Sequence, residues 1–159
     1  MTGPLAITIT INGEPATRAV EPRLSLADFL RAEGFTGTHV GCEHGVCGAC
    51  TIRVDGRTAR GCLTLAVQCD GLEVETIEGA TGNGCVADLQ DAFIENNALQ
   101  CGFCTPGMLL TADELLQENV SPTRTEIREH LSGNYCRCTG YQAIVDAVEQ
   151  VARQRAERT

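Results

Sequence analysis

The first half of the chain alternates hydrophobic and polar positions in short runs, the pattern of β-strands. The run AITITI ends at Asn12 and Gly13, a dipeptide typical of a tight hairpin, so a second strand is expected directly after it. A helix is predicted to begin near Ser25 and to end at Gly34, between strands. The predicted strands cover residues 6–11, 14–20, 51–54 and 72–77.

Beyond Gly79 the hydrophobic period changes from that of strands to that of helices. The glycine-rich segment 80–84 is predicted to be a linker. Four helical stripes are predicted after it: Leu89 and Phe93; Met108, Leu109, Ala112, Leu115 and Leu116; Ile127 and Leu131; and Tyr141, Ile144, Val145, Val148 and Val151. The chain is therefore predicted to be an α+β protein, with a small sheet domain over 1–79 and a domain of about four helices over 80–159.

Composition and charge exclude several classes of function. Of the 159 residues, 43% are hydrophobic and 21% charged, an ordinary globular balance. The net charge of −9 argues against binding to nucleic acid or to an anionic membrane, since both need a basic face. No apolar run approaches the roughly 20 residues of a membrane span, and the first residues do not resemble a signal peptide. We expect a cytoplasmic protein.

Ten cysteines are unusual in such a chain, and eight of them fall into two groups. Abundant cysteine in a reducing compartment indicates metal or redox chemistry more often than disulfides. Cys69 and Cys85 stand apart and are expected to be inert thiols. The first group is Cys42, Cys47, Cys50 and Cys62, and the second is Cys101, Cys104, Cys136 and Cys138.

The first group has the spacing C-x4-C-x2-C-x11-C, which is that of the plant-type [2Fe-2S] ferredoxin loop. Glycines in the loop permit it to curl around a cluster and bring backbone N–H groups to the sulfurs. A zinc knot is less consistent with three cysteines in one loop. A Rieske centre would need a second Cys-His pair, which His39 and His130 do not supply, so His44 is interpreted as a loop residue.

The second group combines a C-x2-C pair before a predicted helix with a C-x-C pair between two helices. Pro106 falls in the predicted first helical turn, where proline is tolerated. Two such pairs suit a second binuclear cluster, but spacing alone also allows zinc, because four thiolates bind either metal.

Three segments together resemble a known family. CEHGVCGAC at 42–50, QCGFCTPG at 100–107 and NYCRCTGY at 134–141 are similar to the small iron–sulfur subunit of the xanthine oxidase family of molybdenum hydroxylases. Members with such a separate subunit include carbon monoxide dehydrogenase, quinoline oxidoreductase and 4-hydroxybenzoyl-CoA reductase. The resemblance extends from about residue 7 to residue 151.

The resemblance implies a β-grasp plant-type ferredoxin domain followed by a four-helix [2Fe-2S]-binding domain. It also implies that the eight grouped cysteines hold two [2Fe-2S] clusters. Electrons would pass from molybdopterin on a large subunit through both clusters to FAD on a medium subunit, in a dimer of heterotrimers. Gln100 and Cys138 would lie against the pterin, and substrate chemistry would belong to the large subunit.

Some alternatives stay open at this point. A free-standing two-cluster ferredoxin is the main one, since the charge of −9 suits a carrier that docks electrostatically. A zinc-stabilised interaction module is another. Arg137 either raises the potential of the second cluster or pairs with a partner subunit. The loop residues 43–46 weakly favour relatives that act on organic substrates.

Overall fold

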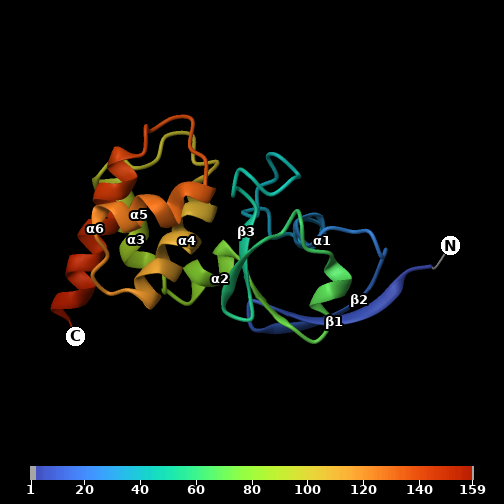
Figure 1. The fold of residues 1–159 in the computed structure, drawn as a ribbon. Helices are drawn as coiled ribbons and strands as arrows, with labels where there is room; N and C mark the ends of the chain where they lie inside the picture. Colours follow the sequence, from blue (N-terminus) through green and yellow to red (C-terminus); the bar gives the residue numbers. More distant parts are fainter. Residues whose placement is uncertain (1–2, 159) are drawn as a thin grey trace.

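A five-stranded sheet forms the first half of the protein in a computed structural model that describes residues 3–158 (Figure 1). The order across the sheet is β2-β1-β5-β3-β4, in which β1 and β5 are parallel and the other neighbours are antiparallel. Asn12 and Gly13, both with positive φ, make the tight turn between β1 and β2. The strands are β1 (Leu5–Ile11), β2 (Glu14–Val20), β3 (Thr51–Val54), β4 (Arg57–Arg60) and β5 (Glu73–Glu75).

Helix α1 (Leu26–Ala32) provides the apolar cover of this sheet. Ser25 caps it by accepting a hydrogen bond from the Asp28 backbone N–H at 3.1 Å. Leu26 and Leu30 are fully buried and belong to the same core as Ile9 of β1. The sequence prediction of this helix is confirmed, and its removal of apolar surface from water stabilises the sheet.

The second half of the described chain is helical and lies beside the sheet (Figure 1). Helix α4 contributes Met108 and Ala112 to a core that also contains Ile144 and Val148 of α6, all fully buried. No helix within residues 3–158 is long and apolar enough to cross a membrane. The helices are α2 (Ile77–Gly82), α3 (Ala87–Glu95), α4 (Thr105–Glu118), α5 (Arg124–His130) and α6 (Gln142–Glu157), with 3-10 turns at Ala66–Cys69 and Leu131–Gly133.

Three sequence predictions need correction around these elements. The expected linker 80–84 is wrong, because α2 extends to Gly82 and buries Ala80 against Val86 and Leu110. The last strand is shorter than predicted, since β5 ends at Glu75. Tyr141 does not belong to the buried stripe of α6: it precedes the helix, has φ of 69° and is exposed.

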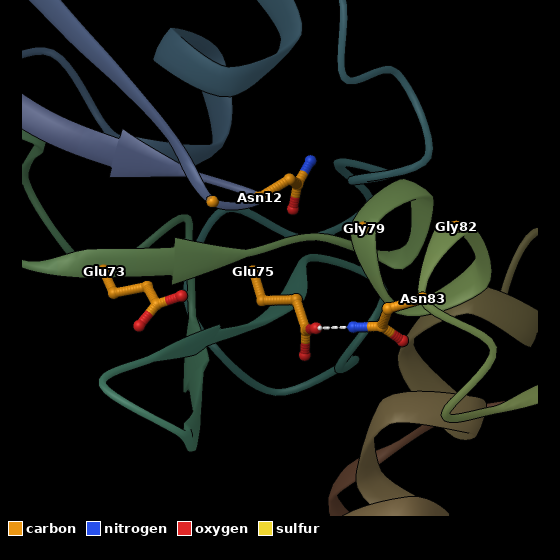
Figure 2. A pocket seen from close by; sticks show the side chains of 7 residues that line it. Asn12, Glu73, Glu75, Gly79, Gly82 and Asn83 are labelled. Carbon is orange, nitrogen blue, oxygen red and sulfur yellow. Dashed lines mark hydrogen bonds between the residues drawn. The ribbon is translucent and has the colours of Figure 1, made fainter.

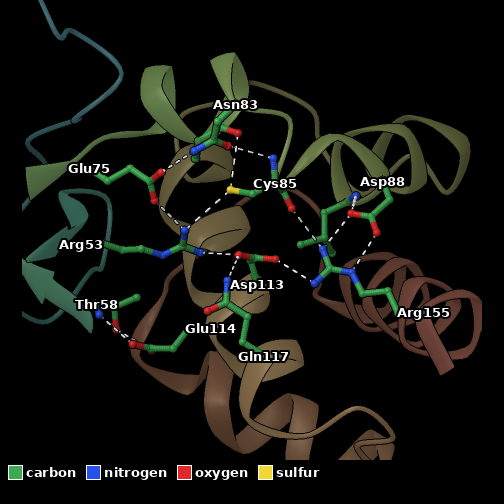
Figure 3. A network of polar contacts seen from close by, with 12 residues as sticks. Arg53, Thr58, Glu75, Asn83, Cys85, Asp88, Asp113, Glu114, Gln117 and Arg155 are labelled. Carbon is green, nitrogen blue, oxygen red and sulfur yellow. Dashed lines mark hydrogen bonds and ion pairs between the residues drawn. The ribbon is translucent and has the colours of Figure 1, made fainter. Parts of the chain in front are cut away.

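A buried ion network joins the sheet to the helices (Figure 3). Arg53 of β3 pairs with Glu75 of β5 at 2.7 Å and with Asp113 of α4 at 2.5 Å. Arg155 of α6 pairs with Asp113 and with Asp88 of α3, both at 2.8 Å. Because Asp113 is 1% exposed and touches both arginines, it is the shared anion that ties β3 to α4 and α6.

Candidate iron–sulfur site

The first cysteine group lies in the loop between α1 and β3 and in the turn after β4. Cys42 contacts Cys47, and Cys62 contacts Cys50, whose sulfur accepts the Cys62 backbone N–H at 3.4 Å. Gly45 has φ of 85°, and a Cβ there would collide with the side chain of Leu63. The glycine therefore permits the tight curl that brings all four thiols together.

Backbone hydrogen-bond donors and burial shift the pKa values of the thiols in this first group in opposite directions. Hydrogen bonds from the backbone at His44 and Cys47 lower the pKa of Cys42 to about 6. Burial and the neighbouring Cys50 raise the pKa of Cys62 to about 11. Four thiols this close do not all ionise without a compensating positive charge, which is what metal ions supply.

The second cysteine group surrounds a small cavity at one end of the helices. The Sγ atoms of Cys101 and Cys138 are 3.6 Å apart, and Cys104 contacts Cys136. Cys104 immediately precedes α4, with Pro106 in the first turn, as the sequence predicts. The cavity has a volume of about 170 Å³ and is lined by Cys101, Phe103, Cys104, Tyr135, Cys136, Arg137 and Cys138.

In this second group, nearby hydrogen-bond donors lower the pKa of Cys136, whereas the pKa of Cys104 is raised. Burial raises the pKa of Cys104 to about 12. Burial opposes ionisation of Cys136 as well, but hydrogen bonds from Thr139, from the Cys138 backbone and from Cys104 together outweigh it and lower the pKa of Cys136. The Thr139 hydroxyl donates to the Cys136 sulfur at 3.2 Å. Tyr141, whose backbone is left-handed, accepts the Cys136 backbone N–H on its hydroxyl oxygen at 2.9 Å.

Gln100 lies beside this second group. Its side-chain amide donates to the backbone carbonyl of Cys138 at 3.1 Å. Gln100, Cys101 and Cys138 are all exposed. The two residues that the resemblance places against a pterin are therefore neighbours on an open face of the protein.

The two cysteine groups meet directly across the boundary between sheet and helices. The Tyr135 backbone N–H donates to the Cys47 carbonyl at 2.8 Å. His39 stacks on Phe103 with ring centroids 4.7 Å apart, and its Nδ1 lies 2.8 Å from the Phe103 carbonyl oxygen. Sequence reasoning did not find this contact, because nothing in either motif indicates that the loops touch.

The remaining cysteines and His44 lie apart from these pairs. Cys69 is buried in the sheet core, and Cys85 lies next to Arg53 with its sulfur 3.8 Å from an Arg53 nitrogen. Burial raises the pKa of both thiols. The His44 imidazole turns back on the Cys42 carbonyl through Nδ1, as expected of a loop residue.

The donor set fits binuclear clusters. Among residues 3–158, no three His, Cys, Asp or Glu side chains are arranged to hold one metal ion. The grouped cysteines meet instead as pairs, two in each group. Pairs of thiolates suit a [2Fe-2S] cluster, which is held by four cysteines spread over two irons.

A larger cavity of about 410 Å³ lies elsewhere, at the junction of the sheet and α2 (Figure 2). Its lining includes Asn12, Glu73, Glu75 and Asn83, and Asn83 donates to Glu75 at 2.8 Å. No cysteine lines it. This hollow is thus separate from the cysteine groups.

Comparison with known proteins decides the family. Residues 9–90 match the model of a 2Fe-2S iron-sulfur cluster binding domain, and residues 76–149 match the model of a [2Fe-2S] binding domain. The chain is 54% identical to caffeine dehydrogenase subunit gamma of Pseudomonas sp. strain CBB1, over 92% of this chain and 90% of that protein. This chain belongs to the small iron–sulfur subunits of the xanthine oxidase family.

Other members of the family are equally similar to this iron–sulfur subunit. The nicotine 6-hydroxylase small subunit of Paenarthrobacter nicotinovorans is 55% identical, over 89% of this chain and 86% of that protein. The crystal structure of quinoline 2-oxidoreductase from Pseudomonas putida 86 superposes with a TM-score of 0.89 at 51% identity, covering 99% of this chain and 98% of the matched chain. The sequence resemblance is confirmed, and both matched domain models describe iron–sulfur clusters rather than zinc sites.

Proposed function

We propose that this subunit transfers electrons, through two [2Fe-2S] clusters, between a molybdopterin centre on a large partner and FAD on a medium partner. The observation that carries the proposal is the contact between the cysteine groups, where the Tyr135 N–H donates to the Cys47 carbonyl at 2.8 Å. Each cluster, when bound, accepts and releases one electron at a time. A chain that holds two such centres in contact is suited to a relay.

The protein's own residues would hold these clusters as two sets of thiolates. Backbone N–H groups favour the thiolate at Cys42, and the Thr139 hydroxyl favours it at Cys136. The proposed ligands are Cys42, Cys47, Cys50 and Cys62 for the first cluster and Cys101, Cys104, Cys136 and Cys138 for the second. We assign the first to a β-grasp domain over 1–79 and the second to a domain over 80–159 with α3–α6 as its four helices.

The exposed side of the second cysteine group is the proposed contact with the molybdenum subunit. Gln100 and Cys138 lie together there, and both are exposed. Through its hydrogen bond to the Cys138 carbonyl, Gln100 would orient the Cys138 segment against the pterin. The first group would then lie nearer the FAD.

Exposed apolar side chains next to the cysteine groups support association with partners. Val46 and Leu63 flank the first group, and Phe103, Tyr135 and Tyr141 flank the second; each is at least 38% exposed. Such a concentration of exposed apolar residues is typical of an interface. We propose a dimer of heterotrimers, working in the cytoplasm, where thiols remain reduced until they bind metal.

We also propose that the complex acts on an organic nitrogen heterocycle. Relatives at 51–55% identity are named for caffeine, nicotine and quinoline. The substrate itself would bind to the large subunit, where its C–H bond is hydroxylated.

Purification from the native host tests this function. The chain should co-elute on gel filtration with two larger chains and with molybdenum and FAD, and the complex should be brown. A solitary monomer that retains its iron would contradict the subunit role and favour the free-standing carrier.

A further inference from the structure

Asn134 connects the two cysteine groups from inside the domain boundary. It is 1% exposed and lies two residues before Cys136. Its side-chain amide donates to the Gly48 carbonyl at 3.3 Å and to the Thr51 hydroxyl at 3.4 Å. Gly48 follows Cys47 directly, so this one side chain contacts the backbone that carries a cysteine of each group.

The side-chain oxygen of Asn134 is hydrogen-bonded as well. Its oxygen accepts from the Thr111 hydroxyl and from Arg60, both at 3.3 Å. Arg60 donates further to the Gly133 carbonyl at 2.9 Å. Thr111 comes from α4, and Arg60 comes from β4. With partners from both halves of the protein, the orientation of the amide is determined, and it cannot shift without losing several hydrogen bonds.

Packing around Asn134 leaves no room for adjustment. A Cβ at Gly48 would lie 2.5 Å from the Gly133 carbonyl oxygen and 2.7 Å from the Asn134 amide. A Cβ at Gly107, in the first turns of α4, would collide with the Gly48 carbonyl. The absence of side chains at Gly48 and Gly107 therefore permits the loop of the first group to sit directly on the segment of the second.

We propose that Asn134 is the positioning residue that sets the separation, and with it the coupling, of the two cysteine groups. The proposal rests on the two-cluster function argued above. Asn134 has a role distinct from that of the cysteines. Among residues 3–158 its side chain hydrogen-bonds to Gly48, Thr51, Arg60 and Thr111 and to no sulfur. Through these bonds it maintains the hydrogen bond from Tyr135 N–H to the Cys47 carbonyl. That hydrogen bond, together with the covalent bonds of Cys47 and those from Tyr135 to Cys136, makes a short connection between the groups.

Two variants and one control test the proposal in the purified native complex. Asn134→Ala removes all four side-chain hydrogen bonds. Asn134→Asp keeps the volume and the acceptor side, but it places an oxygen against the Gly48 carbonyl in place of a donor. Thr58→Val is the matched control, because Thr58 of β4 also bonds across the boundary, to Glu114 of α4 at 2.6 Å, away from the cysteines.

The readout is the magnetic interaction between the two reduced clusters, measured by low-temperature EPR after iron analysis. We expect wild type and Thr58→Val to show resolved splitting between the two centres. Both Asn134 variants should keep both clusters and lose that splitting, and the peptide containing the Tyr135 amide should exchange hydrogen faster. Iron content separates the two explanations, because a purely structural defect would lower it. The midpoint potential of each isolated signal is measured as a further check.

Each other outcome has a definite meaning. Wild-type complex with fewer than two clusters contradicts the proposed function, whatever the variants show. Splitting that persists in both Asn134 variants overturns the positioning role while leaving the function intact. Loss of the second cluster in both variants, with Thr58→Val fully loaded, also overturns it, because Asn134 would then be needed to hold ligands rather than to set their separation.

Discussion

The sulfur of Cys136 receives a hydrogen bond from a single hydroxyl group, that of Thr139 at 3.2 Å. The Tyr141 backbone N–H donates to the same hydroxyl oxygen at 3.2 Å and so orients it toward the sulfur. A donor to a ligand sulfur stabilises the more negative, reduced state of an iron–sulfur cluster and raises its potential. Thr139 is therefore expected to tune the second cluster.

Thr139→Val should lower the midpoint potential of the second cluster by roughly 40 mV, from a hydrogen bond worth about 1 kcal/mol in a one-electron couple. Thr139→Ser retains the hydroxyl and should retain the potential. Potentiometric titration followed by EPR measures both. An unchanged potential in Thr139→Val, with full iron content, would show that the hydroxyl does not face the cluster.

Cys69 and Cys85 are expected to be dispensable for iron binding. Cys69 lies in the sheet core, and the sulfur of Cys85 lies beside the Arg53 side chain. Changing either to Ala should leave iron content and both EPR signals intact, with a stability loss of about 1 kcal/mol for the truncation. Loss of a cluster signal in either variant would refute the ligand assignment.

Among the elements, those with a strong hydrophobic period were predictable and the irregular ones were not. The hairpin of β1 and β2, helix α1 and the helices α3–α6 follow directly from spacing. Strand β4 has the sequence RTAR, with no buried alternation, so only its pairing with β3 defines it. The glycine-rich sequence of α2 predicts a linker, but the burial of Ala80 against Leu110 of α4 stabilises it as a helix.

The ion network between these elements could not be predicted from the sequence either. Arg53, Asp113 and Arg155 are far apart along the chain, and each alone resembles an ordinary charged residue. Together they place β3 on α4 and α6, with Asp113 buried between the two guanidinium groups (Figure 3).

Asp113→Ala should lower the free energy of unfolding of the loaded protein by about 3 kcal/mol or more, because it leaves Arg53 buried without one of its two anions. Denaturant titration followed by circular dichroism measures the change. The control is Arg18→Ala, which removes the exposed pair with Glu33 and should have little effect. Equal losses in the two variants would contradict a structural role for the network.

For the molecule as a whole, the ligand candidates could be predicted from cysteine spacing, but their mutual placement could not. Spacing indicates which thiols share a cluster. The contact of Tyr135 with Cys47, the stack of His39 on Phe103 and the amide of Asn134 join distant segments without any periodic signal. These contacts bring the two groups together and make a relay possible.

The order of that relay can be tested with one ligand variant at each cluster. Cys50→Ala should disable the first cluster, so substrate added to the oxygen-free complex should reduce molybdenum and the second cluster while flavin stays oxidised. Cys104→Ala should leave both the first cluster and flavin oxidised. Flavin absorbance and EPR follow the electrons. Circular dichroism and subunit content must first show that each variant is folded, because small metal-binding domains depend on their metal.

Flavin reduction at the normal rate in an intact Cys50→Ala complex would refute the linear order. It would also show that electrons reach FAD without passing the first cysteine group.

Metal and sulfide analysis of the native complex, combined with EPR of its reduced form, tests the central claim most directly. Two groups of four paired cysteines predict four irons and four acid-labile sulfides per chain. Two distinct EPR signals should appear, because the loop of the first group and the helix ends of the second differ in hydrogen bonding and exposure. Two irons together with bound zinc, or a single signal in fully reduced protein, would contradict the account.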